Sequence, residues 1–293
     1  MRKEGEWRPG ASRHAVEARA GLLADARAFF AERGVLEVET PVLSRYGNSD
    51  PNIDSVRTDG LPPRYLRTSP EYAMKRLLVA GFRDIYELGR VFRAGEKGRR
   101  HNPEFTMLEW YRSGMRYLDL ANEVVALVRA CGRGAFDDWP VQRVDYRGLL
   151  LEHTGLDPYV CSEDELADCA AERGVTAGLL DHGEWLDLVM SEVIQPALPG
   201  ESFTIVHDYP PEQAALSRIR NDDPPVAERF ERENREREAR GEEPVPIDRG
   251  LLAALGSGMP ECSGVALGVD RLLMAVLKLD SIDAVLTFSS DRI

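Results

Sequence analysis

Two apolar segments that flank a polar loop restrict the fold of this 293-residue chain more than any other feature. Residues 85–92 and 104–112 have the pattern of β-strands, and the loop 93–103 contains glycine, proline and many charged residues. The pattern predicts a hairpin whose strands lie antiparallel in one sheet. Alternation along the second strand predicts one face with Phe105, Met107, Glu109 and Tyr111, and an opposite face with Glu104, Thr106, Leu108 and Trp110.

The other segments predict an α+β fold with a largely antiparallel sheet. Amphipathic or apolar patterns indicate helices at 13–33, 118–131 and 269–278, with two more within 163–198. Short apolar runs indicate strands at 35–39, 203–206, 264–268 and 284–288. Because no internal repeat and no long Pro-, Gly- or Ser-rich linker interrupts the chain, residues 1–293 are expected to form a single domain.

Residues 218–249 differ from the rest because charged residues dominate them. Glutamate and arginine recur there at i, i+4 spacing, which stabilises a helix by a few tenths of a kcal/mol per pair. The pairs are Glu228/Arg232, Glu231/Arg235, Glu233/Arg237 and Glu236/Arg240. The pattern favours a solvent-exposed helix over a functional patch of charge.

Composition excludes several classes of protein. The chain has 37 basic and 50 acidic residues, a net charge of −13, which argues against a dedicated nucleic-acid binder. It has no apolar run of roughly 18 residues and no apolar leader, so we expect a cytoplasmic protein without a membrane span. Its four cysteines and five histidines are scattered without metal-ligand spacing, so a zinc site is not expected.

Basic residues gather around the hairpin. Between residues 64 and 116 there are twelve Arg or Lys and six Asp or Glu, a local charge of +6. Guanidinium groups suit a polyphosphate, although a solvated hairpin tip explains the same charge equally well. The chain has neither a P-loop nor a G-x-G-x-x-G turn, so a bound nucleotide needs a different cradle. The basic residues at the loop end are Arg90, Arg93, Lys97, Arg99, Arg100 and His101.

The face shared by Phe105, Glu109 and Tyr111 combines an aromatic ring, a carboxylate and a phenol. Phe105 is suited to stack on a base, and Glu109 with Tyr111 is suited to bind an ammonium group. A buried carboxylate on an apolar face needs a partner or a ligand. A structural ion pair between Glu109 and one of the many arginines is the alternative interpretation.

Residues 264–271 form a strand that leads into an apolar helix. The small residues of this strand allow a ligand to approach the backbone closely. Arg271 lies in the first turn of the helix, where positive charge is unfavourable unless an anion is nearby. An ordinary strand–helix junction is the alternative.

Together these segments resemble the class II aminoacyl-tRNA synthetases, specifically the lysyl type. Residues 85–112 resemble their motif 2, residues 264–279 their motif 3, and residues 13–41 their motif 1, which is the dimer element. The run from Thr68 to Glu71 resembles the lysyl-type substrate loop. The resemblance implies a class II catalytic domain, with a mostly antiparallel sheet flanked by helices, that forms a homodimer.

The tRNA synthetases of this family carry an anticodon-binding domain before motif 1, and none is expected here because motif 1 begins at about residue 13. Residues 110–112, 207–210 and 262–266 are similar to those of stand-alone lysyl-type catalytic cores. The resemblance implies an enzyme that adenylates (R)-β-lysine or lysine with ATP and Mg²⁺ and transfers it to a lysine of elongation factor P. Lysylation of tRNA is the less favoured alternative.

The resemblance also implies roles for single residues at the ATP end of the site. Arg93 is expected to hold the α-phosphate, and Phe105 and Arg271 to contact adenine from its two sides. Arg93 and Arg271 are the residues expected to act in catalysis. The remaining ATP contacts are expected from His101, Asn102 and Gly268.

At the amino-acid end, the resemblance assigns substrate binding to two groups of residues. The loop residues Ser69, Pro70 and Glu71 are expected to bind the amine near the reacting carboxylate. Glu109 and Tyr111 are expected to bind the distal ammonium group.

The chain departs from the family pattern in two places. The adenine-reading glutamate that often follows the motif 2 arginine is replaced by Gly95, and Glu96 is expected to substitute for it. A strand of the pattern E-L-x-N-G-F-x-E-L, which supplies Mg²⁺ ligands in the family, is missing, as if about 25 residues were skipped. The metal ligands are therefore not identifiable, and a catalytically silent paralogue or deletion variant remains the second hypothesis.

Overall fold

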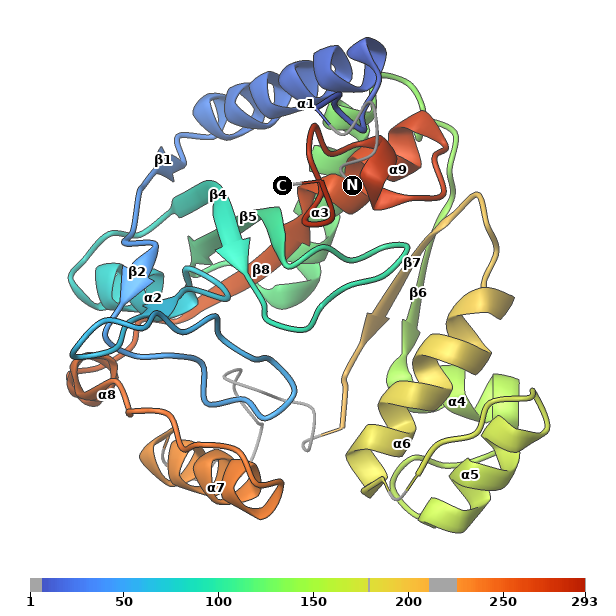
Figure 1. Ribbon diagram of the computed structural model, residues 1–293. Coiled ribbons are helices and arrows are strands. Elements are labelled where there is room, and N and C mark those ends of the chain that lie inside the picture. Colours follow the sequence, from blue (N-terminus) through green and yellow to red (C-terminus); the bar gives the residue numbers. More distant parts are fainter. Residues whose placement is uncertain (1–6, 179, 211–225, 293) are drawn as a thin grey trace. The chain divides into compact units, whose positions relative to one another are not determined.

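A computed structural model describes residues 7–178, 180–210 and 226–292 of the chain (Figure 1). The chain divides into two compact units. The first consists of Met1–Ala135 and Pro225–Ile293, and the second of Phe136–Pro224. The single domain expected from the sequence stays a prediction.

The first unit is built on a four-stranded sheet in the order β1-β4-β5-β8. Its strands are β1 (Leu36–Glu37), β4 (Ile85–Phe92), β5 (Glu104–Ser113) and β8 (Cys262–Gly268). The β4–β5 and β5–β8 pairs are antiparallel, and only β1 runs parallel to its neighbour. The predicted hairpin and the largely antiparallel sheet are therefore confirmed.

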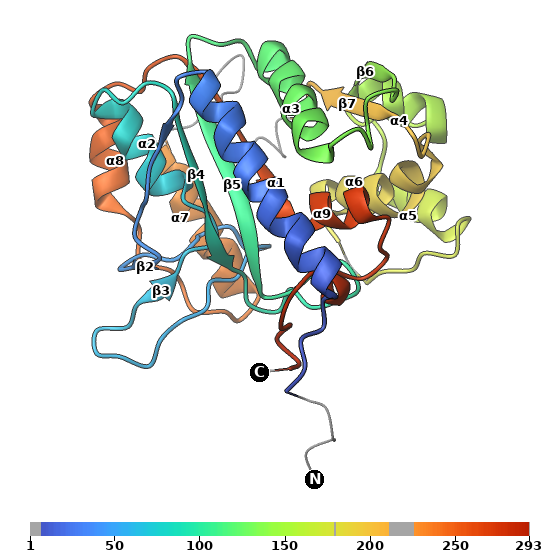
Figure 2. The same cartoon turned by 90° about the horizontal axis from the view of Figure 1, so that it is seen from above.

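Helices α1 (Arg13–Glu32) and α3 (Tyr117–Gly132) cover one face of this sheet, and Figure 2 shows α1 lying across β4 and β5. Phe30 of α1 stacks on Tyr86 with 4.4 Å between ring centroids and meets Trp110 edge-on at 5.4 Å. The helix begins at Ser12, whose hydroxyl accepts a hydrogen bond from the Ala15 amide, and ends before Gly34, whose φ is +66°.

Helix α2 (Glu71–Val79) packs on the opposite face, the face of Glu109 and Tyr111, and contacts α8 (Arg249–Gly256). Met74 and Leu78 of α2 form a buried cluster with Ile85 and Tyr111. This cluster fixes the start of α2 beside the middle of β5.

Helix α9 (Val269–Leu277) follows β8 directly, as the sequence predicts. Asp270 in its first turn is buried and accepts a hydrogen bond of 2.7 Å from the Thr106 amide of β5. Its other carboxylate oxygen pairs with Arg19 of α1. This carboxylate therefore joins α9, the hairpin and α1.

The predicted strand at 284–288 is wrong. A 3-10 turn, η4 (Ile282–Ala284), begins there, and no strand follows it before residue 292. The run is apolar because Val285 and Leu286 are buried. The carbonyls of Leu286 and Thr287 accept hydrogen bonds from the Ala11 and Gly10 amides, so the segment ties the chain ends together instead of joining the sheet.

The remaining elements of the first unit are a small strand pair and one further helix. Strands β2 (Leu43–Ser44) and β3 (Tyr65–Leu66) form a small antiparallel pair. Helix α7 (Val226–Ala239) lies within the charged segment, and residues 218–225 of that segment are outside the part of the chain that the structure describes.

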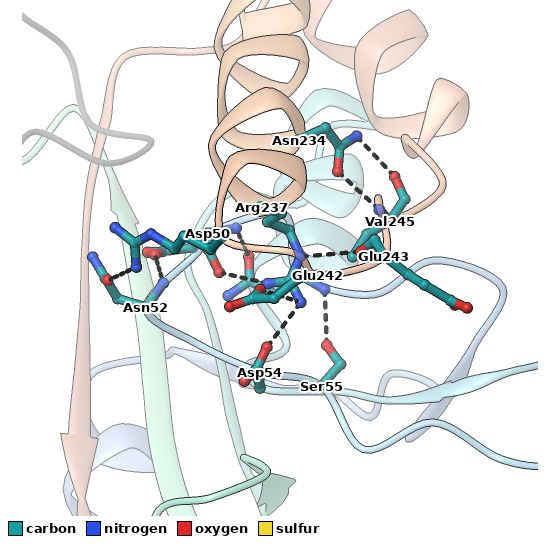
Figure 3. A network of polar contacts seen from close by, with 11 residues as sticks. Asp50, Asn52, Asp54, Ser55, Asn234, Arg237, Glu242, Glu243 and Val245 are labelled. Atoms are coloured by element: carbon teal, nitrogen blue, oxygen red, sulfur yellow. Dashed lines mark hydrogen bonds and ion pairs between the residues drawn. The ribbon is translucent and has the colours of Figure 1, made fainter.

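The predicted solvent-exposed helix is found at α7, where most of the described residues are exposed, but two of its side chains are buried. Phe230 is buried and its ring lies 5.8 Å from that of Tyr72. Arg237 is also buried and forms ion pairs with Asp54 and Glu242, at 2.8 and 3.0 Å, instead of the expected pair with Glu233 (Figure 3). Helix α7 therefore anchors the loop around residue 54.

The second unit combines a parallel strand pair with a helical core. Its strands are β6 (Val141–Asp145) and β7 (Phe203–His207). Its helices are α4 (Tyr146–Thr154), α5 (Glu163–Ala171) and α6 (His182–Val189), followed by the π-helical turn η1 (Met190–Ile194) and the 3-10 turn η2 (Gln195–Ala197). The sequence patterns predict β7, α5 and α6 but miss β6 and α4.

None of the described helices in either unit is long and apolar enough to span a membrane.

Candidate active site

Strand register gathers the expected site residues on one face of the first unit's sheet. Glu109 lies opposite Glu87 on β4 and opposite Ala266 on β8. In the row nearer the hairpin loop, Met107 lies opposite Gly89 and Gly268. The face thus leads from the buried carboxylates towards Phe105 and the loop.

Glu109 is the central polar group of this face, and only 3% of its surface is exposed. The Ser69 hydroxyl donates to one carboxylate oxygen at 2.6 Å, and the Tyr111 hydroxyl donates to the other at 2.8 Å. Burial, reinforced by the charge of Glu71, raises the pKa of Glu109 to about 7. The two hydroxyl donors and Lys75 oppose that rise in pKa.

Glu87, the cross-strand neighbour of Glu109, has different partners. The Arg67 guanidinium pairs with one of its oxygens, and the Thr40 hydroxyl donates to the other at 2.7 Å. Gly89 makes room for this pair, since a Cβ there would lie 2.5 Å from Arg67 Nη2. The structural ion pair considered for Glu109 is thus found at Glu87, and within the described ranges Glu109 has no arginine partner.

The sequence interpretation missed Arg67, Glu87 and Thr40. The signal was present, because Glu87 is a carboxylate in an apolar strand and alternation places it on the same face as Ile85 and Gly89. Its guanidinium partner is twenty residues away in the chain, so spacing alone could not identify it.

Tyr111 lies against Gly264 of β8. A Cβ at Gly264 would lie 2.3 Å from Cε1 of Tyr111, so the side chain occupies the space that a larger residue would fill. The expectation that ligand approaches the backbone is therefore wrong at Gly264. At Gly268 a Cβ would meet only the Cδ of Arg271, at 4.0 Å, so the backbone there is open to a ligand.

The loop before α2 brings the other amine-binding residues to Glu109. Ser69 accepts a hydrogen bond of 3.0 Å from the Glu71 amide while it donates to Glu109. Pro70 is the residue immediately before the helix, and its fixed φ of −77° suits a helix start. The Glu71 carboxylate contacts Lys75 Nζ at 2.8 Å.

The hairpin loop and α9 bring together the arginines expected at the phosphate end. The Arg93 guanidinium lies 5.3 Å from the centroid of the Phe105 ring and contacts Glu96 at 3.2 Å. Arg271 hydrogen bonds to Nε2 of His101, and burial followed by the charge of Arg271 lowers the pKa of His101. A neutral His101 therefore accepts this bond.

Asn102 has protein partners at both ends of its amide. Its Nδ2 donates to the Glu104 carbonyl at 2.6 Å, and its Oδ1 accepts from the Ser290 amide at 3.0 Å. These bonds fix the end of the hairpin loop. The contact of Asn102 with ATP stays a prediction, as does the reading of adenine by Glu96.

The metal ligands stay unidentified. Class II synthetase-like ligases generally use ATP and Mg²⁺, and hard oxygen ligands are what Mg²⁺ requires. Within residues 7–178, 180–210 and 226–292, no group of three or more His, Cys, Asp or Glu side chains is placed to hold a metal ion. The described residues therefore offer no ready-made set of three protein ligands for Mg²⁺.

Comparison with known proteins agrees with this geometry. The family model of class II tRNA synthetases (D, K and N) matches residues 6–160 and 198–292. The chain belongs to this family of class II tRNA synthetases.

Its relatives carry a more specific name. A protein of Haemophilus ducreyi is 39% identical over 98% of this chain and 97% of its own length, and its name is elongation factor P–(R)-β-lysine ligase. Proteins with the same name from Mannheimia succiniciproducens and Salmonella typhi are 39% and 38% identical, with 98% and 100% of both chains covered.

The alignments also reveal a difference in length. The alignment with the Salmonella typhi protein spans 328 positions and covers the whole of this 293-residue chain, so about 35 positions are filled by the relative alone. In the described residues between His207 and Cys262 there is no strand. Both observations agree with the expected loss of one family strand.

Proposed function

We propose that this chain is an ATP-dependent ligase that adenylates (R)-β-lysine, or lysine, and transfers it to a lysine side chain of elongation factor P. Three relatives that align over nearly their whole length bear the name of this activity. The proposal places the protein in the cytoplasm, where translation occurs, and gives it no role on tRNA.

One observation carries the amino-acid part of the proposal. Glu109 is a buried carboxylate that has a hydroxyl donor at each oxygen. Within the part of the chain that the structure describes, no arginine pairs with it. Such a group is costly unless a ligand completes its partners. A substrate ammonium supplies the missing positive charge, and a substrate without that amine leaves the buried carboxylate uncompensated.

The ATP part of the proposal depends on the loop end of the same face. Arg93 supplies positive charge near Phe105, Arg271 contacts His101 of the hairpin loop, and the backbone at Gly268 is open. In the first step a carboxylate oxygen of the amino acid attacks the α-phosphorus, the bond to the bridging oxygen breaks, and pyrophosphate leaves with the electron pair. The two arginines stabilise charge as it moves to the leaving group.

The second step needs only an acceptor. The neutral ε-amine of a lysine on elongation factor P attacks the carbonyl carbon, AMP leaves with the electron pair of the broken C–O bond, and the nitrogen loses a proton. No nucleophile of this chain takes part, because positioning and charge stabilisation carry both steps.

Amino-acid-dependent exchange between ATP and pyrophosphate tests the first step. We expect exchange with (R)-β-lysine or lysine, and a loss of at least about tenfold in Glu109→Gln, which keeps the shape but removes the charge. Transfer of labelled amino acid is then measured with elongation factor P and with tRNA as acceptors. Labelling of tRNA alone would contradict the proposed acceptor, and absence of exchange from folded protein would contradict the proposed activity.

A second candidate is favoured by the missing segment. The unfilled alignment positions and the absence of a carboxylate cluster in the described residues support a silent paralogue that binds ATP and an amine without reacting. Calorimetric binding of both ligands together with no exchange would identify this case.

A third part of the proposal, homodimerisation through residues 13–41, is tested by sedimentation, and a monomer at all concentrations would contradict it.

A further inference from the structure

Lys75 is a buried cation beside the proposed amine subsite, and the function proposed above does not use it. Its surface is 9% exposed, and its Nζ lies 2.8 Å from Oε1 of Glu71. Lysine is rarely buried unless it is paired, because the ammonium loses its hydration. The position of this cation therefore needs a reason beyond the surface of a helix.

The i, i+4 pair of Lys75 and Glu71 differs from an ordinary helix pair. Arg232 and Glu236 form such an ordinary pair on α7, with 55% and 45% of their side chains exposed. The side chains of Lys75 and Glu71 are 11% and 32% exposed, so solvent screens their interaction less. The Ser69 hydroxyl links the start of this helix to Glu109, because it accepts a hydrogen bond from the Glu71 amide and donates one to the Glu109 carboxylate.

Two carboxylates in one buried subsite repel each other. The charge of Glu71 raises the pKa of Glu109, and the charge of Lys75 lowers it. With both carboxylates ionised and Lys75 protonated, the three groups have a net charge of −1. That charge balances the net charge of +1 of lysine or (R)-β-lysine, which carry two ammonium groups and one carboxylate.

We propose that Lys75 is a positioning residue of the amine subsite, a resident cation that holds Glu71 and offsets part of the negative charge of the two carboxylates, so that each carboxylate accepts one ammonium group of the substrate. This inference rests on the proposed function for its substrate, but the state of Glu109 in the free protein does not depend on that function. Without Lys75, a larger fraction of Glu109 is protonated at neutral pH, and the distal ammonium meets a weaker partner.

The other charged and titratable groups around Glu109 do not replace Lys75. On β5, Tyr111 donates a hydrogen bond to Glu109, and burial raises its pKa well above the usual value, so it stays neutral. On β4, the charge of Glu87 is paired with Arg67. On β8, burial raises the pKa of the Cys262 thiol, which is also uncharged at neutral pH.

The titration of Glu109 in the ligand-free full chain tests the proposal. Glutamate carboxyl carbons are labelled with carbon-13, the Glu109 signal is assigned by its absence in Glu109→Gln, and its pKa is measured by NMR. We expect Lys75→Met to raise the pKa by about one unit or more, and Lys75→Arg to restore it. The control is Arg232→Met, which removes a cation from an exposed pair of the same spacing and is expected to leave the pKa unchanged.

An unchanged Glu109 pKa in folded Lys75→Met would overturn the inference. Lys75→Gln gives a second reading if the methionine variant does not fold. In the exchange assay, we expect Lys75→Met to raise the KM for the amino acid at pH 7 about tenfold and to shift its pH dependence upward, with kcat unchanged at alkaline pH. A uniform loss of kcat at every pH would indicate a merely structural role and would also overturn it. Absence of exchange in the unsubstituted protein would refute the proposed function alone, because the NMR titration needs no substrate.

Discussion

The ring of Tyr111 rests against the backbone of Gly264, at a position where a Cβ would come within 2.3 Å of Cε1. This contact holds the phenol in line with Glu109, to which its hydroxyl donates at 2.8 Å. A glycine in the middle of a strand usually weakens it, so Gly264 has a specific structural use here. It gives the side chain of the neighbouring strand a flat surface.

The first prediction concerns this contact. We expect Gly264→Ala to displace Tyr111 and to lower the free energy of unfolding by about 1–3 kcal/mol, as overpacking does in other cores. Urea denaturation measures the change. The matched control is Gly268→Ala, whose added methyl group meets only Arg271 Cδ at 4.0 Å, so its stability is expected to stay within about 0.5 kcal/mol. Equal stability of both variants would contradict the close contact.

The second prediction follows from the burial of Glu109. Its pKa is raised from 4.5 to about 7, so between these values the folded protein binds the proton more tightly than the unfolded chain does. The free energy of unfolding therefore falls as the pH rises through this window, by about 3 kcal/mol for the whole shift.

Glu109→Gln is expected to remove that part of the pH dependence. Ligand-free protein is compared by urea denaturation at pH 5 and pH 8. Glu104→Gln is the control, because Glu104 is the exposed first residue of the same strand and pairs loosely with Arg90 at 3.5 Å. If Glu109→Gln kept the full pH dependence, the buried carboxylate would not be its source.

The third prediction addresses Glu96, which contacts Arg93 at 3.2 Å. The Glu96 carboxylate pairs with the Arg93 guanidinium, which is expected to hold the α-phosphate of ATP. It therefore competes with the phosphate for Arg93 and adds negative charge near the expected triphosphate position. We expect Glu96→Gln to lower the KM for ATP about threefold, in keeping with the energy of a partly exposed ion pair. A higher KM would instead support the reading of adenine by Glu96.

The fourth prediction concerns the anchor of α7. Arg237→Met leaves Asp54 and Glu242 without their shared cation, and we expect the free energy of unfolding to fall by about 1–3 kcal/mol. Arg232→Met on the exposed side of the same helix is expected to change it by less than about 0.5 kcal/mol. Thermal unfolding of the two variants side by side distinguishes an anchored helix from a solvated one.

Local patterns predicted the parts of the fold that local forces decide. The hairpin follows from alternation around a polar loop, and α1 follows from the apolar spacing between Ser12 and Gly34. The run at 284–288 failed because burial alone does not distinguish a strand from an apolar segment that closes a core. The buried side of α7 could not be predicted, because Arg237 pairs with Asp54, which lies outside its own helix and far away in the chain.

The site was predictable as a set of residues and not as a set of contacts. Phe105, Glu109 and Tyr111 share a face by alternation alone. The contact between Ser69 and Glu109 joins residues 40 positions apart, and only the packing of α2 on β5 creates it. The same holds for Arg67 and Glu87, whose pairing frees Glu109 for another partner.

The hydrogen bond from the Thr106 amide to Asp270 fixes the distance between β5 and the start of α9. Thr106 follows Phe105 on β5, and Asp270 precedes Arg271 on α9, so one buried carboxylate fixes the backbone beside Phe105 relative to the backbone beside Arg271. Phe105 and Arg271 are 166 residues apart in the chain, yet their backbones cannot move apart without breaking a buried hydrogen bond. A ligand that contacts both residues is therefore held at a spacing that the fold sets before binding.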